Sequence, residues 1–467
     1  MSGGEARTTE GPGRRGPRSD ALVFFGATGD LAFKQIFPAL AALVKSGRLE
    51  IPVVCVGRKE LSREELTARI KKSLDAGGGV DAGAVEALAK RTSFAVVDFG
   101  DAGTFASVRN ALRGAKHPLH YLALPPEVFE KTASDLATAG LAEGARLVLE
   151  KPFGHDAASA RALAEALHRW FPEGSIFRID HYLGKEAVEN IVYFRAANPV
   201  IEAALHGAVE SVQITMAETF GVQGRVEFYD AVGAVRDVVQ NHLLEVIACL
   251  AMDLPATRGE DDLRAARSAL LRQVRTVERS DVVRGQVRGY KDQKGVKPGS
   301  ATETFVALKL AIDSPRWSGV PFFVRAGKSL PVTATELLVR WKPVGSPVLD
   351  DSSPAPSSHL RFRVGPDDVI AFGANVKRDG RAMRGEAREL VTHLAGNHAM
   401  KPYERLLGDA IDGEPALFAR VDAVLEAWRV VGPVLGNAVP VRVYEPGTWG
   451  PDESRNVAPP GGWYDPA

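Results

Sequence analysis

The chain has 467 residues, more than one ordinary hydrophobic core accommodates, so we expect two domains. Apolar residues make up 45% of the chain and charged residues 25%, which is typical of soluble globular proteins. Lysine and arginine together number 58, as do aspartate and glutamate. This balance lacks the basic surplus typical of proteins that bind nucleic acid or an anionic membrane, and we expect neither partner.

The N-terminal residues and the two cysteines indicate where the protein resides. Residues 1–20 are rich in Gly, Pro, Arg and Glu and lack an apolar signal core, so they predict a disordered tail. No stretch reaches the ~18–20 apolar residues of a membrane span. Cys55 and Cys249 each lie in an apolar run, and no Cys-x-x-Cys pair occurs. This usage predicts a cytoplasmic protein without a disulfide framework.

Strand-like apolar runs alternate with amphipathic helical patterns up to Arg178. The runs are mostly apolar on both faces, as in a parallel sheet covered by helices on both sides. The strand candidates are Ala21–Phe25, Ile51–Val56, Ser93–Val97, Leu119–Leu124 and Arg146–Leu149. The helix candidates are Leu31–Lys45, Arg63–Leu74, Phe105–Leu112, Pro126–Ala139 and Ala157–Trp170. The alternation predicts a Rossmann-like, doubly wound parallel sheet in a dinucleotide-binding domain over residues 21–178.

The regular alternation of strand and helix patterns ends in the second half of the chain. Helical patterns cover Lys185–Arg195 and Val232–Met252. The strand candidates lack regular crossover helices and are Val209–Thr219, Thr304–Ile312, Pro321–Arg325, Leu337–Lys342 and Val369–Val376. Loops are expected at residues 285–299 and 345–358. We predict an α+β domain over residues 179–467, with a large, mainly antiparallel sheet, for substrate binding and dimerisation.

A glycine-containing turn follows the first strand and precedes the first helix. It reads Gly26-Ala27-Thr28-Gly29-Asp30-Leu31. Glycines let such a backbone approach a pyrophosphate, and the positive end of the next helix stabilises the anion. Many βα turns carry two glycines for steric reasons alone, so the motif by itself leaves both interpretations open. Its position in the predicted α/β domain favours dinucleotide binding.

The end of the second strand reads Val56-Gly57-Arg58-Lys59. An acidic residue here suits the ribose 2′-hydroxyl of NAD, whereas an arginine suits the 2′-phosphate of NADP. Arg58 therefore favours NADP, with NAD as a weaker alternative because Glu60 is close by. The competing interpretation is that Arg58 starts a solvated loop.

The densest polar cluster runs from Arg178 to Glu186. His181 and Lys185 are four residues apart, so on a helix or its opening turn they would face the same way and form, with Tyr182, a site for a phosphate dianion. Asp180 would project elsewhere and orient another group. The alternative is a charged, solvated helix start.

A second polar cluster, Arg236 to His242, interrupts an apolar helical pattern. On an α-helix, Asp237 and His242 would be separated by about 140°, flanking a ligand without touching each other. A buried histidine is often only a hydrogen-bonded core residue, but His also suits proton exchange near neutral pH. Glu245 lies three residues beyond His242, yet no further ligand pattern supports a metal site, and we predict none.

Taken together, these motifs resemble the glucose-6-phosphate dehydrogenase family from about Ala21 to Tyr444. Their joint occurrence in order is far more specific than any one motif. They are residues 26–31, Tyr-Leu-Ala-Leu-Pro-Pro at 121–126, Glu-Lys-Pro-Phe-Gly at 150–154, residues 178–186, residues 236–242, Pro-Phe-Phe-Val-Arg-Ala-Gly-Lys at 321–328, Tyr-Glu-Arg-Leu at 403–406 and Glu-Ala-Trp at 426–428.

The resemblance implies NADP-dependent oxidation of glucose 6-phosphate at C1 to 6-phosphoglucono-1,5-lactone, the first step of the oxidative pentose phosphate pathway, by a homodimer or homotetramer. His242 would be the general base and Asp180 its partner. The coenzyme residues implied are Gly26, Thr28, Gly29, Asp30, Leu31, Arg58 and Lys151. The sugar-phosphate residues implied are His181, Tyr182 and Lys185 at the phosphate, Glu218, Asp237 and Lys328 at the sugar, and Lys151 between coenzyme and substrate.

Two departures from the family pattern stand out. Thr333 takes the place of a basic residue on the sugar side, which is expected to weaken sugar binding or to relax the choice of hexose phosphate. Phe33-Lys34-Gln35 replaces a more basic run in the first helix, which is expected to lower coenzyme affinity unless the stretch is only surface. The alternatives are a dehydrogenase of another hexose or hexose phosphate, and an inactive coenzyme-binding sensor. Sugar oxidoreductases that share Glu-Lys-Pro typically open with Gly-x-Gly-x-x-Gly, which is absent here.

Overall fold

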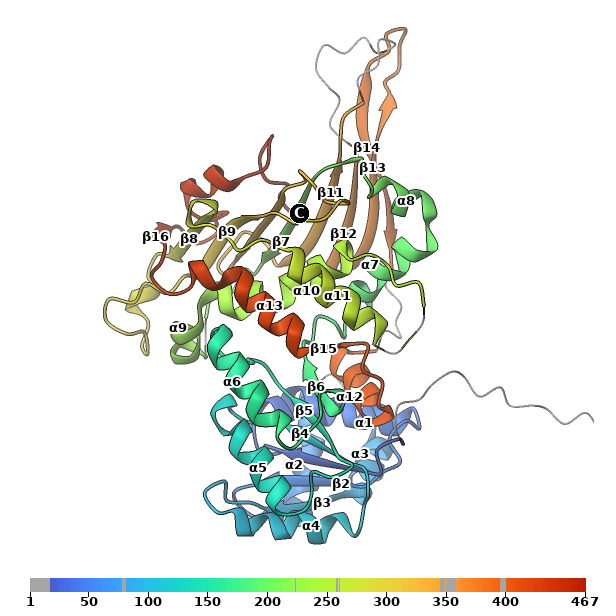
Figure 1. Cartoon of the computed structure of the whole chain (residues 1–467), viewed down its shortest axis with the longest axis vertical. Helices are drawn as coiled ribbons and strands as arrows, with labels where there is room; N and C mark the ends of the chain where they lie inside the picture. The colour runs from blue at the N-terminus through green and yellow to red at the C-terminus, as the bar shows by residue number, and fades with distance from the viewer. Residues whose placement is uncertain are drawn as a thin grey trace, which may run out of the picture.

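The computed structural model describes residues 17–77, 81–222, 224–257, 259, 261–344, 349, 358–394 and 400–467, and two β-sheets organise it (Figure 1). Residues 1–16 of the expected tail and most of the expected loop at 345–358 lie outside these ranges. Ser19 and Asp20, at the end of that tail, donate backbone hydrogen bonds to Ile411 and His117. The tail interpretation therefore does not extend to these two residues.

The N-terminal half forms a mostly parallel sheet, as predicted. Its strand order is β15-β6-β5-β4-β1-β2-β3 within the described residues, and only β15 is antiparallel to its neighbour. The central strands are buried along their whole length because helices cover both faces. The strands are β1 Ala21–Phe25, β2 Val53–Gly57, β3 Thr92–Val96, β4 Pro118–Leu122, β5 Arg146–Leu149, β6 Ile176–Ile179 and β15 Phe418–Ala419.

Helices pack on both faces of this sheet, which makes it the expected Rossmann-like layer. One face is covered by α1, α2, α3 and α12, and the other by α4, α5 and α6. Their bounds are α1 Phe37–Lys45, α2 Arg63–Ala76, α3 Ala82–Arg91, α4 Ala106–Leu112, α5 Phe129–Thr138, α6 Ala157–His168 and α12 Pro402–Asp412. A short π-helix, η1, spans Ala32–Ile36 and leads into α1.

The C-terminal half builds a second, mainly antiparallel sheet. Its order is β14-β13-β12-β11-β7-β10-β9-β8-β16 in the part of the chain that the structure covers, with β7/β10 and β8/β16 as its parallel pairs. The strands are β7 Val209–Ala217, β8 Val282–Val287, β9 Phe305–Leu310, β10 Phe322–Gly327, β11 Ala334–Trp341, β12 His359–Gly365, β13 Asp368–Lys377, β14 Gly385–His393 and β16 Val441–Tyr444. This arrangement confirms the predicted α+β architecture.

Helices cover one face of the second sheet and lie between the two sheets (Figure 1). The α-helices are α7 Glu186–Ala197, α8 Pro199–Ala204, α9 Val226–Ala234, α10 Leu244–Ala251, α11 Asp262–Gln273 and α13 Val421–Val431. A π-helix, η5 Val235–Leu243, joins α9 to α10. Short 3₁₀ turns are η2 Ala102–Phe105, η3 Pro126–Val128, η4 Glu173–Ser175, η6 Arg279–Asp281, η7 Tyr290–Asp292, η8 Gly432–Val434 and η9 Asp452–Val457. Among the residues described, no helix has both the length and the apolarity to cross a membrane.

The structure changes the expected start of the loop at 285–299 and the expected separation of the two halves, and it agrees with the expectation for the cysteines. The predicted loop at 285–299 begins too early, since its first three residues complete β8, where Arg284 forms a buried ion pair with Glu303. The C-terminal half also returns to the first sheet, because α12 packs on α1 and β15 pairs with β6. Cys55 and Cys249 are buried and free, as expected.

Candidate active site

The proposed site residues gather where parallel strands end. Gly26 follows β1, Arg58 follows β2, Lys151 comes two residues after β5, and Asp180 follows β6. These four strands are parallel members of one sheet, so their carboxyl ends lie along the same edge. In open α/β sheets this edge is where ligands bind.

His242 and Asp180 form a buried pair at this edge. Nδ1 of His242 lies 2.5 Å from Oδ1 of Asp180, and the two residues are only 1% and 3% exposed. A carboxylate accepts hydrogen bonds only, so Nδ1 carries the proton and Nε2 keeps its lone pair; this tautomer is assigned from the partners. The pair therefore presents Nε2 of His242 as a base.

The electrostatics keep this pair in the form that can accept a proton. Burial alone would raise the pKa of Asp180, but the adjacent His242 outweighs it and holds that pKa below its usual range. Burial lowers the pKa of His242, Asp180 opposes this effect, and Lys151 adds to it, so the net shift is downward. An unperturbed histidine titrates near 6.5, so His242 is neutral at pH 7.

Lys151 links the pair to the helix that carries His242. Its Nζ lies 2.8 Å from Nε2 of His242 and donates to the main-chain oxygen of Asp237 at 2.9 Å. The Asp237 carboxylate is 3.6 Å from the same ammonium group. Burial would raise the pKa of Asp237, and the cations of Lys151 and Lys328 bring it below its ordinary value.

The helix geometry corrects our expectation for Asp237 and His242. The segment η5 is a π-helix, in which residues five apart are hydrogen-bonded neighbours on successive turns. The 140° separation worked out for an α-helix is therefore wrong, and both residues reach Lys151. π-Helical turns occur frequently at functional sites.

The predicted phosphate cluster converges at the turns that open α7, one of the two local structures considered for it. Lys185 is the residue before α7, and residues 181–184 form turns, so His181 and Lys185 do not share a helix. The turns still fold the side chains together. Nζ of Lys185 lies 4.0 Å from the centre of the Tyr182 ring, and that ring stacks on His242 at 4.5 Å. The His181 ring is 4.4 Å from the His242 ring.

An anion bound at this cluster would favour the charged forms of His181 and Lys185, which their surroundings disfavour. Burial lowers the pKa of both His181 and Lys185, and the neighbouring His242 lowers that of His181 further. Among the described residues, no carboxylate lies within ion-pair distance of Lys185, whose ammonium group donates to the Val364 carbonyl at 3.4 Å. Tyr182 bonds Thr335 through its hydroxyl at 3.0 Å, and burial raises its pKa to about 12. Asp368 and Asp180 act on Lys185 electrostatically and oppose the effect of burial on its pKa. Neither is ion-paired with it among the described residues, so its ammonium group stays open to an anion.

Glu218 and Lys328 meet because β7 and β10 run parallel. Ala217 pairs with Gly327 at the ends of these strands, and the two following side chains form an ion pair. Thr333, the departure from the family pattern, accepts a hydrogen bond from the Thr219 amide at 3.0 Å. It thus supports the backbone beside Glu218 rather than adding a cation.

The coenzyme turn has the shape that a dinucleotide requires. Gly26 has φ +84°, and a Cβ there would lie 2.2 Å from the Ala123 carbonyl oxygen, so only glycine fits. Thr28, Gly29 and Asp30 are exposed, and Leu31 directly precedes η1. The first N–H groups of the helix that follows have no intrahelical partner, which suits an anion such as a pyrophosphate.

Arg58 is exposed, and no hydrogen bond or ion pair joins it to another residue in the described ranges. Its guanidinium is therefore available to a phosphate at the end of β2. The residues present fit an NADP molecule along this edge.

The cluster of Asp180, His181 and His242 also brings three potential metal-ligand atoms within 4.8 Å. Two of these residues already bond each other, and the Lys151 ammonium at Nε2 of His242 would repel a cation. Glu245 instead faces Arg267, with 3.3 Å between their charged atoms. The geometry favours proton transfer over metal binding.

Sequence reasoning did not assign a role to Glu150, the residue before Lys151. It is buried and accepts a hydrogen bond from the Tyr121 hydroxyl at 2.5 Å. Tyr403 of α12 also bonds it. Burial raises the pKa of Glu150 to about 7, against the effect of both tyrosines. Its only sequence signal was membership in two motifs, because its partners come from distant segments.

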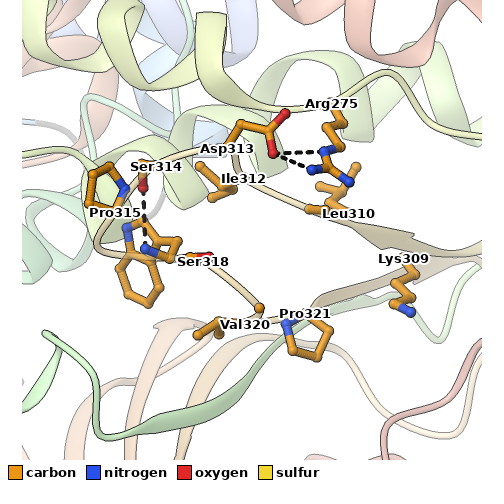
Figure 2. Close-up of a pocket in the computed structure, with 13 residues that line it drawn as sticks. Arg275, Lys309, Leu310, Ile312, Asp313, Ser314, Pro315, Ser318, Val320 and Pro321 are labelled. Atoms are coloured by element: carbon orange, nitrogen blue, oxygen red, sulfur yellow. Dashed lines mark hydrogen bonds and ion pairs between the residues drawn. The ribbon is translucent and has the colours of Figure 1, made fainter.

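A pocket elsewhere in the molecule contains none of the proposed residues (Figure 2). Its volume is about 610 Å³, and it is lined by residues from the end of β9 to Pro321, together with Arg275, which pairs with Asp313 at 2.5 Å. It adjoins the start of β10, whereas Lys328 follows the end of that strand. At ~3.3 Å per residue the two ends are about 20 Å apart, so the pocket is separate from the His242 cluster.

Two family models match the chain. The model described as "Glucose-6-phosphate dehydrogenase, NAD binding domain" covers residues 23–190, and the one described as "Glucose-6-phosphate dehydrogenase, C-terminal domain" covers residues 192–463. Together they span both sheets and all of the proposed site residues.

Similar proteins agree over nearly the whole length. Glucose-6-phosphate 1-dehydrogenase 1 of Mycobacterium tuberculosis is 39% identical over 451 residues, which is 95% of this chain and 95% of the relative. The crystal structure of glucose-6-phosphate 1-dehydrogenase from Mycobacterium avium superposes with a TM-score of 0.90 at 39% identity, covering 96% of this chain and 99% of that one. A glucose-6-phosphate dehydrogenase in complex with its substrate glucose-6-phosphate has a TM-score of 0.87 at 30% identity, covering 97% of this chain and 100% of that one.

Proposed function

The chain belongs to the glucose-6-phosphate dehydrogenase family, and we propose that its NADP-dependent oxidation of glucose 6-phosphate takes place at the His242–Asp180 pair. The reaction removes a proton from the C1 hydroxyl and a hydride from C1, which leaves the 1,5-lactone and starts the oxidative pentose phosphate pathway. Bound NADP supplies the hydride acceptor. The protein must therefore supply the base, the binding of the sugar phosphate and the alignment of C1.

His242 is the proposed base, and the buried hydrogen bond to Asp180 is the observation that carries this proposal. Nε2 takes the C1 hydroxyl proton, and the ring becomes an imidazolium. The Asp180 carboxylate stabilises that cation and fixes the tautomer, as the acid of a His–Asp pair does. Lys151 now donates to Nε2, so it must give up this position to the substrate hydroxyl, to which it can donate instead.

The substrate's two ends meet two different groups of residues. His181, Tyr182 and Lys185 are proposed to hold the 6-phosphate, since their side chains lie together and no carboxylate is ion-paired with Lys185 among the described residues. Glu218, Asp237 and Lys328 are proposed to bond the ring hydroxyls from the opposite side of His242. Carboxylates and an ammonium group alternate there, which suits the donors and acceptors of a sugar.

We also propose which residues bind NADP. Residues 26–31 hold the pyrophosphate, and Arg58 binds the 2′-phosphate, so that NAD is used less well. Lys151 lies between coenzyme and sugar. Arginine binds a phosphate bidentately, and no carboxylate lies within ion-pair distance of Arg58 in the described ranges to compete with it.

The decisive experiment replaces His242 with asparagine and follows reduced nicotinamide at saturating NADP and glucose 6-phosphate. Loss of a general base lowers kcat by about 10²–10⁴-fold, while the Kd for NADP stays within twofold. His168→Asn, the same change at a half-exposed histidine in α6, is the matched control. A His242→Asn variant that keeps more than a tenth of the kcat would disprove the assignment of the base.

A homodimer through the edge of the second sheet is a further proposal. β14 is the edge strand, and the β13–β14 hairpin projects beyond the body of the molecule (Figure 1). Its exposed apolar side chains include Phe372, Val376, Leu390 and Val391. Such an edge tends to pair with another chain. Leu390→Lys should convert dimer to monomer in light scattering, whereas an unchanged mass would place the interface elsewhere.

A cytoplasmic location stays a prediction.

A further inference from the structure

One arginine outside the predicted site ties down the coenzyme turn. Arg69 lies on α2, some 40 residues after the turn in the sequence. Its Nε donates to the Ala27 carbonyl at 3.2 Å, and its Nη2 donates to the carbonyls of Thr28 and Gly29 at 2.6 and 3.0 Å. A single guanidinium thus holds three consecutive carbonyls of the turn.

The opposite side of the turn is fixed as well. The amides of Gly26 and Ala27 both donate to the Val56 carbonyl of β2 at 3.1 Å. With these amides directed at β2 and three carbonyls directed at α2, the turn has little freedom left. The N–H groups at the start of the following helix are then held ready for a phosphate before one arrives.

The Arg69 guanidinium group packs on the ring of Phe33. The Arg69 guanidinium carbon lies 5.6 Å from the centre of the Phe33 ring, a cation–π contact. We expected the sequence Phe33-Lys34-Gln35 to weaken coenzyme binding or to be surface. Lys34 and Gln35 are indeed exposed, and Phe33 is half-buried beneath Arg69. The turn therefore has a cation on each side, Arg69 from α2 and Lys34, whose ammonium group lies 3.4 Å from the Asp30 carboxylate.

We propose that Arg69 is a positioning residue for coenzyme binding, which pre-organises the Gly26–Leu31 turn through its three carbonyls. This inference rests on the proposed placement of the coenzyme at that turn. Because the pyrophosphate is common to NADP and NAD, the effect of Arg69 is the same for both coenzymes. In this respect Arg69 differs from Arg58, which acts on the 2′-phosphate alone. Ordering a binding loop in advance reduces the free energy that a ligand must spend on it.

The test compares Arg69→Met and Arg69→Lys by calorimetric titration of each folded variant with NADP and with NAD. Arg69→Met should weaken both coenzymes by about tenfold, which corresponds to about 1.4 kcal/mol. Arg69→Lys, which keeps a cation but loses the fork of donors, should recover part of the loss. At saturating coenzyme, kcat and the KM for glucose 6-phosphate should stay within twofold. Arg63→Met, at an exposed arginine of the same helix, is the matched control.

Three results would overturn the proposal. Unchanged Kd values for NADP and NAD in Arg69→Met would show that the turn binds the coenzyme equally well without the Arg69 hydrogen bonds. A loss confined to NADP would show that Arg69 touches the 2′-phosphate directly. An equal rise in the KM for NADP and the KM for glucose 6-phosphate would show that Arg69 has a general structural role. Hydrogen exchange of the unaltered protein separates this inference from its premise: if NADP does not protect amides 26–31, the coenzyme placement itself is wrong.

Discussion

Replacing Asp180 with asparagine removes one charge from the buried pair while keeping the size of the side chain. The imidazolium formed on His242 then loses a carboxylate whose oxygen lies 2.5 Å from Nδ1. With the charge centres roughly 4 Å apart and an effective dielectric constant of about 20, that interaction is worth about 4 kcal/mol. Since each 1.36 kcal/mol is tenfold in rate, kcat should fall by about 10³-fold. An asparagine amide that donates to Nδ1 would also place the proton on Nε2, which abolishes the base.

The assay is the initial rate of reduced nicotinamide formation, with both substrates saturating. The Kd for NADP should stay within twofold, because Asp180 lies away from the coenzyme turn. Asp135→Asn, which alters a buried aspartate paired with a half-exposed Lys131 on α5, controls for the loss of a buried carboxylate charge away from the site. A fall in kcat of less than tenfold for folded Asp180→Asn would refute the argument, since the charge would then not act on the transition state.

Three further predictions follow from the electrostatics. Lys151 lowers the pKa of His242, so Lys151→Met should move the acid limb of the kcat/KM profile to higher pH, because the base then becomes protonated sooner as the pH falls; an unmoved limb would contradict the coupling. Arg58→Ala should raise the KM for NADP by about tenfold or more and leave that for NAD nearly unchanged, which parallel assays with the two coenzymes would check. Lys185→Ala should raise the KM for glucose 6-phosphate by about tenfold, with little effect on the KM for NADP; equal changes would remove Lys185 from the phosphate site.

The sequence predicted those elements whose signal is local. β1 and β5 have the predicted bounds, and the other four-to-six-residue apolar runs deviate from theirs by one to three residues, with the largest difference at the start of β11. Most of these strands are buried on both faces, although β3 is partly exposed, so composition alone identifies most of them. β6 and β15 were missed, and β15 has only two residues and pairs with a strand far away in the sequence. The helix α3 was missed because its buried face is largely alanine.

The site was predicted by type of residue more successfully than by geometry. Asp180, His181, Tyr182 and His242 do converge. Their convergence, however, depends on turns before α7 and on a π-helix in place of an α-helix, which spacing rules for regular helices do not describe. Arg69 gave no local signal at all, because its partners are main-chain carbonyls that any residue provides. Contacts of this kind become visible only once the chain is folded.

The pairing of β15 with β6 has a consequence for how the chain is synthesised. The N-terminal sheet receives its last strand only after residue 419 has been made, and Phe418 then packs on Phe177 with ring centres 4.8 Å apart. Until then, one edge of the sheet and the face of α1 that α12 covers stay open on the nascent chain. Open edges and apolar faces attract other chains. The first sheet is therefore complete only when nearly the whole chain has been made, and until then its open edge and the apolar face of α1 are exposed to other chains.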